Sequence, residues 1–246
     1  MNDIRSILFL AFPNVSEQDL LAPFELLKSV AWSLGARGEK LDVTLGSFEG
    51  GVVTTQMGAK LEMDRKIELG DRYDLVYVPG GIGAGQLSLN EEALEFLRAH
   101  QREGRWVAAN CAGVGVLHRA GILAGANVTS PATLARRLPE QGTPIGTPRR
   151  AWKVDTERKL FTSGGAATVH PGTIALVTAL FGEAQGRELA ASWDTLPLHG
   201  EALFSKLGPE MRDDATIAVG LQDQWENDFL PQAASCGTDD TACRAA

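Results

Sequence analysis

A cysteine at the end of a short apolar segment is the residue in this sequence best placed for chemistry. Residues 105–110 have strand character, Cys111 follows directly, and the small residues after it lead into a helical pattern. This order is typical of a nucleophile elbow, a strained turn that presents one side chain at the start of a helix. Free N–H groups there favour a thiolate, so we expect a lowered pKa at Cys111. The alternative is that Cys111 is a small buried hydrophobic residue.

Strands alternate with helices around this elbow, a pattern that predicts an α/β fold with a mainly parallel sheet. The predicted strands are residues 7–12, 41–48, 73–78, 105–110, 151–154 and 159–162, with a hairpin over 52–61. The predicted helices are residues 19–27, 91–102, 113–120, 132–138, 172–181, 183–193 and 214–221. Ligands bind beyond the carboxyl ends of parallel strands, so the ends at Phe12, Val78, Asn110 and Thr162 should converge on one crevice beside the cysteine.

Composition narrows the class of protein. The chain has 246 residues, 44% of them hydrophobic, and a formal net charge of −8. We expect one domain over residues 1–230, a flexible tail over 231–246, and a small-molecule partner rather than nucleic acid or a membrane. The apolar segment at 7–12 is too short for a signal sequence or a membrane span, which favours a cytoplasmic protein. Three cysteines give no disulfide framework. Cys236 and Cys243 lie in the tail without a nearby histidine, so we expect no metal site there and a local disulfide between them only under oxidising conditions.

Several motifs together resemble the DJ-1/PfpI superfamily and, within it, the isocyanide hydratases most. They are Asp19-Leu20-Leu21-Ala22-Pro23, Tyr77-Val78-Pro79-Gly80-Gly81, Cys111-Ala112-Gly113 and Thr162-Ser163-Gly164-Gly165. The resemblance implies a flavodoxin-like three-layer sandwich, a homodimer, and an acidic residue hydrogen-bonded to the elbow cysteine. That position falls on Asp19, with Glu17 as the second candidate. The alternative for Asp19 is a helix N-terminal carboxylate that caps free N–H groups.

The same geometry predicts an anion site and a pocket. The N–H groups of Gly81 and Ala112 would point into the crevice, and Gly80 would let a ligand approach the backbone closely. The alternative is that the two glycines only form a turn that ends the strand. The predicted pocket residues are Gly80, Asn110, Gly165 and His170. His170 stands where the family is rich in glycine, and residues in the position of Asn110 serve more often in packing or turns.

Two departures from the family pattern bear on the activity. Ala112 stands where many hydrolytic members have histidine and isocyanide hydratases commonly have threonine, so we expect no peptidase-like Cys–His pair. The segment 130–133 lacks the histidine of the chaperone and deglycase-like branch.

The resemblance implies a lyase that hydrates an isocyanide to an N-substituted formamide, without a metal or organic cofactor. Cys111 would attack the substrate carbon, Asp19 would move a proton, and a thioimidate would form. The alternative is a redox-sensing or chaperone-like protein in which Cys111 is oxidised. A ligand-sensing half of a transcription regulator is less expected, because no basic helix-turn-helix pattern follows the predicted sheet.

Overall fold

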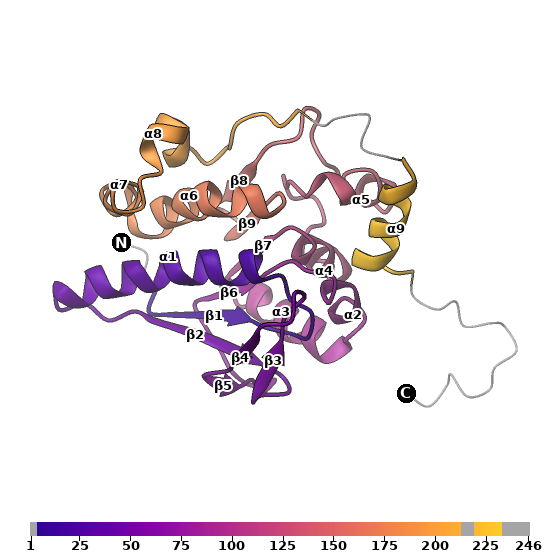
Figure 1. Ribbon diagram of the computed structural model, residues 1–246, viewed down its shortest axis with the longest axis horizontal. Coiled ribbons are helices and arrows are strands. Elements are labelled where there is room, and N and C mark those ends of the chain that lie inside the picture. The colour runs from indigo at the N-terminus through magenta and orange to yellow at the C-terminus, as the bar shows by residue number, and fades with distance from the viewer. Residues whose placement is uncertain (1–3, 213–218, 233–246) are drawn as a thin grey trace, which may run out of the picture.

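The computed structural model describes residues 4–212 and 219–232, and a seven-stranded sheet lies at its centre (Figure 1). The strand order is β5-β2-β1-β6-β7-β9-β8. The strands are β1 (Ser6–Leu10), β2 (Asp42–Ser47), β5 (Arg65–Lys66), β6 (Leu75–Val78), β7 (Trp106–Asn110), β8 (Trp152–Asp155) and β9 (Leu160–Ser163). Every neighbouring pair is parallel except β8 and β9. The expected α/β fold with a mainly parallel sheet is confirmed, and β1, β6, β7 and β9 end at one edge.

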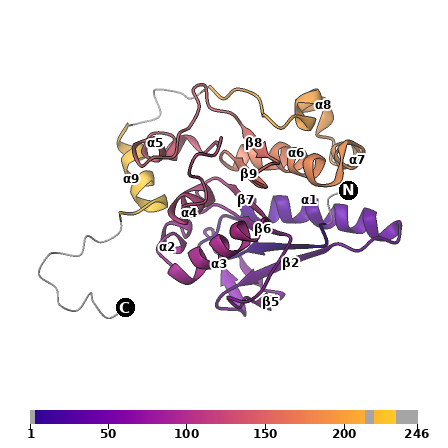
Figure 2. The same cartoon turned by 180° about the vertical axis from the view of Figure 1, so that it is seen from behind.

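Helices cover both faces of this sheet. In Figures 1 and 2, α1 and α6 lie side by side on one face, while α3 lies on the other. The helices are α1 (Glu17–Ala36), α2 (Ala84–Leu87), α3 (Glu91–Arg102), α4 (Gly113–Arg119), α5 (Arg137–Glu140), α6 (Val169–Phe181), α7 (Glu183–Ser192), α8 (Leu196–His199) and α9 (Val219–Phe229). The described residues also form the 3-10 helices η1 (Ala132–Leu134), η2 (Ala166–Thr168) and η3 (Gly200–Phe204).

Aromatic side chains fill the layer between the sheet and α1. Phe9 stacks on Tyr77 with ring centroids 4.9 Å apart, and Phe24 of α1 packs edge-on against Phe9 at 5.5 Å. Further across the sheet lies Phe161, whose ring centroid is 6.3 Å from that of Tyr77. Because side chains alternate along a strand, Asn110 and Ser163 lie on this same face, two residues beyond Ala108 and Phe161. The aromatic layer therefore supports a more polar layer at the carboxyl edge.

The predicted hairpin is confirmed, and its tip is fastened to the carboxyl edge of the sheet. Its strands are β3 (Val52–Thr54) and β4 (Lys60–Glu62), which pair antiparallel. The N–H of Gln56 donates to the carbonyl of Val15 at 2.8 Å, and the Gln56 side-chain oxygen accepts from the N–H of Ile82 at 3.0 Å. The hairpin thus joins the β1–α1 loop to the turn that follows β6.

The C-terminal helix α9 packs against α2 and η1 (Figure 1). Glu226 is 1% exposed, and its carboxylate lies 2.6 Å from Nη2 of Arg136 and 3.6 Å from Nε of Arg137. A buried carboxylate is tolerated when cations and hydrogen bonds compensate its lost hydration, so this cluster holds the helix in place. Of the helix predicted over 214–221, residues 214–218 lie outside the described residues, as do Cys236 and Cys243 in the tail.

Most predicted elements are found with their ends shifted by a few residues. The helix α6 begins at Val169 rather than at residue 172, because Pro171 is accepted in the first turn, where its missing N–H costs no hydrogen bond. The segment 132–138 is divided into η1 and α5. The two-residue strand β5 was not predicted. Within residues 4–212 and 219–232, no helix is long and apolar enough to cross a membrane.

Candidate active site

The residue with the predicted elbow conformation is Cys111, which has a φ of 49°. It follows β7 and precedes α4, whose N-cap is Ala112. The N–H of Cys111 donates to two carbonyl oxygens, those of Ser163 at 3.2 Å and Gly164 at 2.8 Å. A positive φ costs a non-glycine residue about 1–3 kcal/mol and persists only where the surroundings enforce it. Here the neighbouring strand β9 and the segment after it enforce the turn, and the half-buried thiol is directed to the carboxyl edge.

The glycines after β6 allow this turn to pack against their backbone. A Cβ atom on Gly80 would lie 2.5 Å from Cβ of Cys111 and 2.7 Å from Oδ2 of Asp19. A Cβ atom on Gly81, whose φ is 121°, would lie 2.3 Å from the backbone nitrogen of Ser16. Real Cβ atoms do not approach other atoms so closely, so neither position accepts a side chain without movement. The two glycines bring the thiol and the Asp19 carboxyl together.

Asp19 is buried near the start of α1, 2% exposed. Its Oδ1 accepts a hydrogen bond of 2.7 Å from Nδ2 of Asn110, which is fully buried. The side chain of Ser16, the N-cap, accepts from the Asp19 N–H at 3.4 Å. Burial raises the pKa of Asp19 from 3.8 to about 6, against hydrogen bonds from Ser16, Cys111 and Asn110 that lower it. The carboxyl therefore titrates in the range where proton transfer is useful.

Glu17, the second candidate, lies two residues before Asp19 and faces the turn of the β3–β4 hairpin. Its Oε1 accepts hydrogen bonds from the hydroxyl of Thr55 and, at 2.9 Å, from the N–H of Met57. The Thr55 hydroxyl lowers the pKa of this carboxyl. Glu17 therefore fixes the tip of the β3–β4 hairpin, and of the two acids it is Asp19 that lies at the thiol.

The electrostatics at the thiol differ from the sequence expectation of a lowered pKa. Burial raises the pKa of Cys111 most, and the negative charge of Asp19 raises it further. The backbone N–H groups of Ala112 and Gly81 act in the opposite direction. Their influence on the thiol shows that both amides predicted for the anion site lie at the sulfur. The expectation was wrong in direction because it counted the helix start and left out the burial of the thiol, to which the Asp19 charge adds.

The remaining predicted pocket residues lie in different places. Gly165 precedes η2 and follows Gly164, which binds the Cys111 N–H, and a Cβ atom on Gly165 would meet open space. His170, in the first turn of α6, packs edge-on against Trp193 with ring centroids 5.5 Å apart. Burial lowers the pKa of His170, and the charges that act on it are those of Glu25 and His199. Its pocket-lining role stays a prediction.

Sequence reasoning missed the hydroxyl groups behind the carboxyl. The Tyr77 hydroxyl lies near the side chains of Thr173 and Ser163, and the charges of Asp19 and Cys111 act on it. Ser163 stands opposite Asn110 in the register of β7 and β9. A tyrosine within the apolar strand 75–78 was the available signal, because a buried phenol needs a polar partner.

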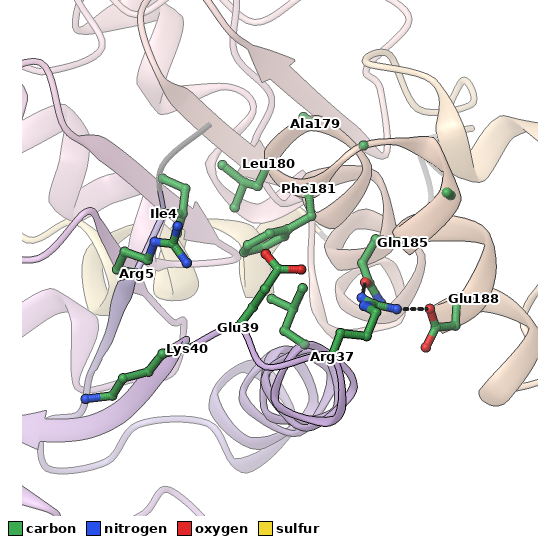
Figure 3. Close-up of a pocket in the computed structure, with 13 residues that line it drawn as sticks. Ile4, Arg5, Arg37, Glu39, Lys40, Ala179, Leu180, Phe181, Gln185 and Glu188 are labelled. Carbon is green, nitrogen blue, oxygen red and sulfur yellow. Dashed lines mark hydrogen bonds and ion pairs between the residues drawn. The ribbon is translucent and has the colours of Figure 1, made fainter. Parts of the chain in front are cut away.

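A cavity of about 460 Å³ lies at the opposite, amino edge of the sheet, and Figure 3 shows the residues that line it. Arg37 at the end of α1 lies within it, and its guanidinium donates to Gln185 and, at 3.1 Å, to Glu188 of α7. Arg5 and Lys40, at the amino ends of β1 and β2, also line it. In contrast to the Cys111 site, its charges are partly exposed and lie near opposite charges.

Comparison with known proteins supplies the family. Residues 5–176 match the DJ-1/PfpI family. The chain belongs to this family. Among curated DJ-1/PfpI relatives, isonitrile hydratase from Pseudomonas putida is 32% identical over 158 residues, 64% of either chain. Deglycase PfpI from Pyrococcus furiosus is 33% identical over 126 residues, 50% of this chain and 70% of the deglycase.

Other members show how varied the DJ-1/PfpI proteins are. The HTH-type transcriptional regulator GbdR from Pseudomonas aeruginosa is 30% identical over 188 residues, 76% of this chain and 49% of the regulator. The solved structure of oxidised Toxoplasma gondii DJ-1 has a TM-score of 0.65 and 20% identity, covering 77% of this chain and 97% of that one. The relatives thus include enzymes that act on different substrates as well as a transcriptional regulator.

Proposed function

We propose that the protein is a cysteine-dependent hydro-lyase that adds water to an isocyanide and releases an N-substituted formamide. The observation that carries the proposal is the grouping of Cys111 with the buried carboxyl of Asp19 and the N–H groups of Gly81 and Ala112. These are a nucleophile, a group that exchanges protons near pH 6, and two fixed donors for negative charge. The match to isonitrile hydratase supports this substrate class.

The first half-reaction forms a bond between sulfur and carbon. The thiol proton passes to Oδ2 of Asp19, and the sulfur attacks the terminal carbon of the isocyanide. Asp19 then gives the proton to that carbon, which yields a thioimidate on Cys111. During the attack the N–H groups of Gly81 and Ala112 stabilise the negative charge, first on sulfur and then on the substrate.

The second half-reaction consumes water. Water adds to the thioimidate carbon, the nitrogen gains a proton, and the carbon–sulfur bond breaks. The products are the formamide and the free thiol of Cys111, so isocyanide plus water accounts for every atom and no oxidant is needed. Asp19, with a pKa of about 6, accepts the proton of the incoming water and returns one to the sulfur.

Intact-protein mass spectrometry tests the proposal. Wild type and Cys111→Ala are incubated with alkyl and aryl isocyanides, and formamide is measured in the same samples. We expect formamide and a transient adduct of one isocyanide mass in wild type only. Formamide formed equally by Cys111→Ala would contradict the role of the cysteine.

The alternative of a redox-sensing protein is favoured by one observation: Cys111, a residue of intermediate exposure, lies beside a carboxyl able to hydrogen-bond an oxidised sulfur. It predicts no formamide and a gain of one or two oxygen atoms at Cys111 under mild peroxide.

The homodimer and the cytoplasmic location expected from the sequence are part of the proposal. Light scattering tests the dimer, and fractionation of the source cells tests the location.

A further inference from the structure

Three buried polar atoms lie unpartnered behind the Asp19 carboxyl. They are the Tyr77 hydroxyl, Oδ1 of Asn110 and Oγ of Ser163, and within the described part of the chain none makes a hydrogen bond of normal geometry, although the Thr173 and Ser163 side chains are near enough to lower the pKa of Tyr77. All three side chains belong to residues with 0% exposure. Asn110 and Ser163 face each other across β7 and β9, and Tyr77 lies near Ser163. Buried polar groups are normally satisfied, so a group of three at one place points to a shared ligand such as water.

The amide of Asn110 connects this group to the reacting atoms. Its Nδ2 donates to Oδ1 of Asp19 at 2.7 Å, while Oδ2 of Asp19 lies on the side of Gly80 and Cys111. A donor held against Oδ1 leaves Oδ2 as the oxygen that can take a proton. If the amide were turned over, its oxygen would face the carboxylate and repel it. The orientation of Asn110 therefore decides which carboxyl oxygen exchanges a proton with the thiol.

We propose that Asn110 is a positioning residue that directs the exchangeable proton to Oδ2 of Asp19, and that one internal water bound to Tyr77 and Ser163 holds its amide in this orientation. The water would donate to Oδ1 of Asn110 and share hydrogen bonds with the two hydroxyls. Three polar partners are what a buried water typically has. The inference deepens the proposed function and rests on it for the catalytic role of Asp19.

The groups that face Asp19 are few. Cys111 from the elbow and Tyr77 from β6 are the titratable side chains that interact with it, and Ser16 and Asn110 are its hydrogen-bonding neighbours. Burial and the charge of Asp19 raise the pKa of Tyr77, so the phenol stays neutral and remains a donor. Thr173 of α6 is already bonded to the carbonyl of Val169 at 2.7 Å. The donated hydrogen bond from Asn110 stabilises the ionised carboxyl and so lowers its pKa against the effect of burial.

The test measures the Asp19 carboxyl without any substrate. The ¹³C resonance of its carboxyl carbon, assigned by its loss in Asp19→Asn, is followed against pH in wild type and in Asn110→Leu. Losing a hydrogen bond to a charged group should raise the midpoint by about one to two pH units. Tyr77→Phe and Ser163→Ala should raise it by a smaller amount. Ser88→Ala removes a buried hydroxyl bonded to Gly85 at 2.7 Å and should leave the midpoint unchanged.

Several outcomes would overturn the inference. An unchanged midpoint in Asn110→Leu would do so, as would equal shifts in Ser88→Ala and Ser163→Ala. If Asn110→Leu does not fold, Tyr77→Phe and Ser163→Ala decide, because each removes only a hydroxyl. A high-resolution crystal structure must show one water within hydrogen-bond distance of all three atoms, and an empty or differently bridged space would refute the water. Shifted midpoints without formamide from wild type would refute the proposed hydration while the positioning role stands.

Discussion

The two edges of the sheet hold two kinds of polar site. At the amino edge, the cavity of about 460 Å³ is bordered by charges that lie near opposite charges, and Arg37 and Glu188 each keep 46% of their side-chain surface exposed. At the carboxyl edge, Asp19 is 2% exposed and bonded to a neutral amide, next to a thiol on a strained turn. Hydrogen bonds from Ser33 and Arg37 lower the pKa of Glu188, so this carboxylate stays charged and has little tendency to exchange protons near neutral pH. The groups suited to proton transfer lie where desolvation leaves a carboxyl between its two protonation states, and not at the edge that has the cavity of about 460 Å³.

Replacing the Asp19 side chain should reduce turnover more than any other substitution except the loss of Cys111 itself. Asp19→Asn keeps the acceptor for Asn110 and removes the exchangeable proton, so we expect the rate of formamide production to fall by about 10²–10⁴-fold. Steady-state kinetics with one isocyanide measure it. Turnover close to that of wild type would mean that another group moves the proton.

The pH dependence of turnover should follow the same carboxyl. Below its pKa of about 6, Asp19 is protonated and no longer accepts the thiol proton, so kcat/KM should fall about tenfold per pH unit on the acid side. Asp19→Asn should lose this acid limb and keep a flat profile there. An acid limb that survives in the variant would assign the titration to a different group.

The stability of the fold should depend on pH in the opposite sense. The pKa of Asp19 is about 6 in the folded protein and 3.8 when unperturbed, so the folded protein binds the proton more tightly. Its contribution to stability is complete below about pH 4 and is lost as the pH rises through 6, a loss of about 3 kcal/mol. Urea unfolding at pH 8 should therefore show Asp19→Asn to be more stable than wild type. At pH 4 the difference should disappear, and an equal difference at both pH values would contradict the desolvation argument.

Glu17 provides the matched control, a carboxylate two residues away on the same helix. Glu17→Gln keeps an acceptor for the N–H of Met57 and weakens only the fastening of the hairpin, so the free energy of unfolding should fall by less than about 1 kcal/mol. Turnover should change by no more than about threefold, since the helix start stays in place. A loss as large as that of Asp19→Asn would show that the hairpin itself controls the site.

The amino-edge cavity should give the smallest effect. Arg37→Ala removes a half-exposed ion pair with Glu188, worth less than about 1 kcal/mol. We expect unchanged formamide production and almost unchanged urea unfolding. Reduced turnover in this variant would mean that the cavity communicates with the thiol, which would end the contrast between the two edges.

The parts that could be predicted from sequence are those with local causes. The helix α3 has the predicted bounds, because its apolar period, the Asn90 cap and the closing Gly104 lie within one segment. The turn at Cys111 was visible for the same reason. The two-residue strand β5 has no such local pattern, since its only support is the neighbouring β2.

The sequence predicts which residues lie near Cys111, but it does not predict their hydrogen bonds or the direction in which their pKa values shift. Asp19 and Asn110 are 91 positions apart in the chain, so only the folded sheet shows that one donates to the other. The raised pKa of the Cys111 thiol likewise depends on burial by several elements. The spacing of motifs indicates which residues meet at the carboxyl edge of the sheet. Their desolvation depends on all the side chains and backbone that pack around them in the fold.

The positive φ of Cys111 has a consequence for the evolution of the chain. A backbone with a φ of 49° is strained for cysteine, whereas glycine adopts this conformation without strain. A laboratory screen that rewards heat resistance alone should therefore favour Cys111→Gly, and a population relieved of selection on its substrate should drift toward the same replacement.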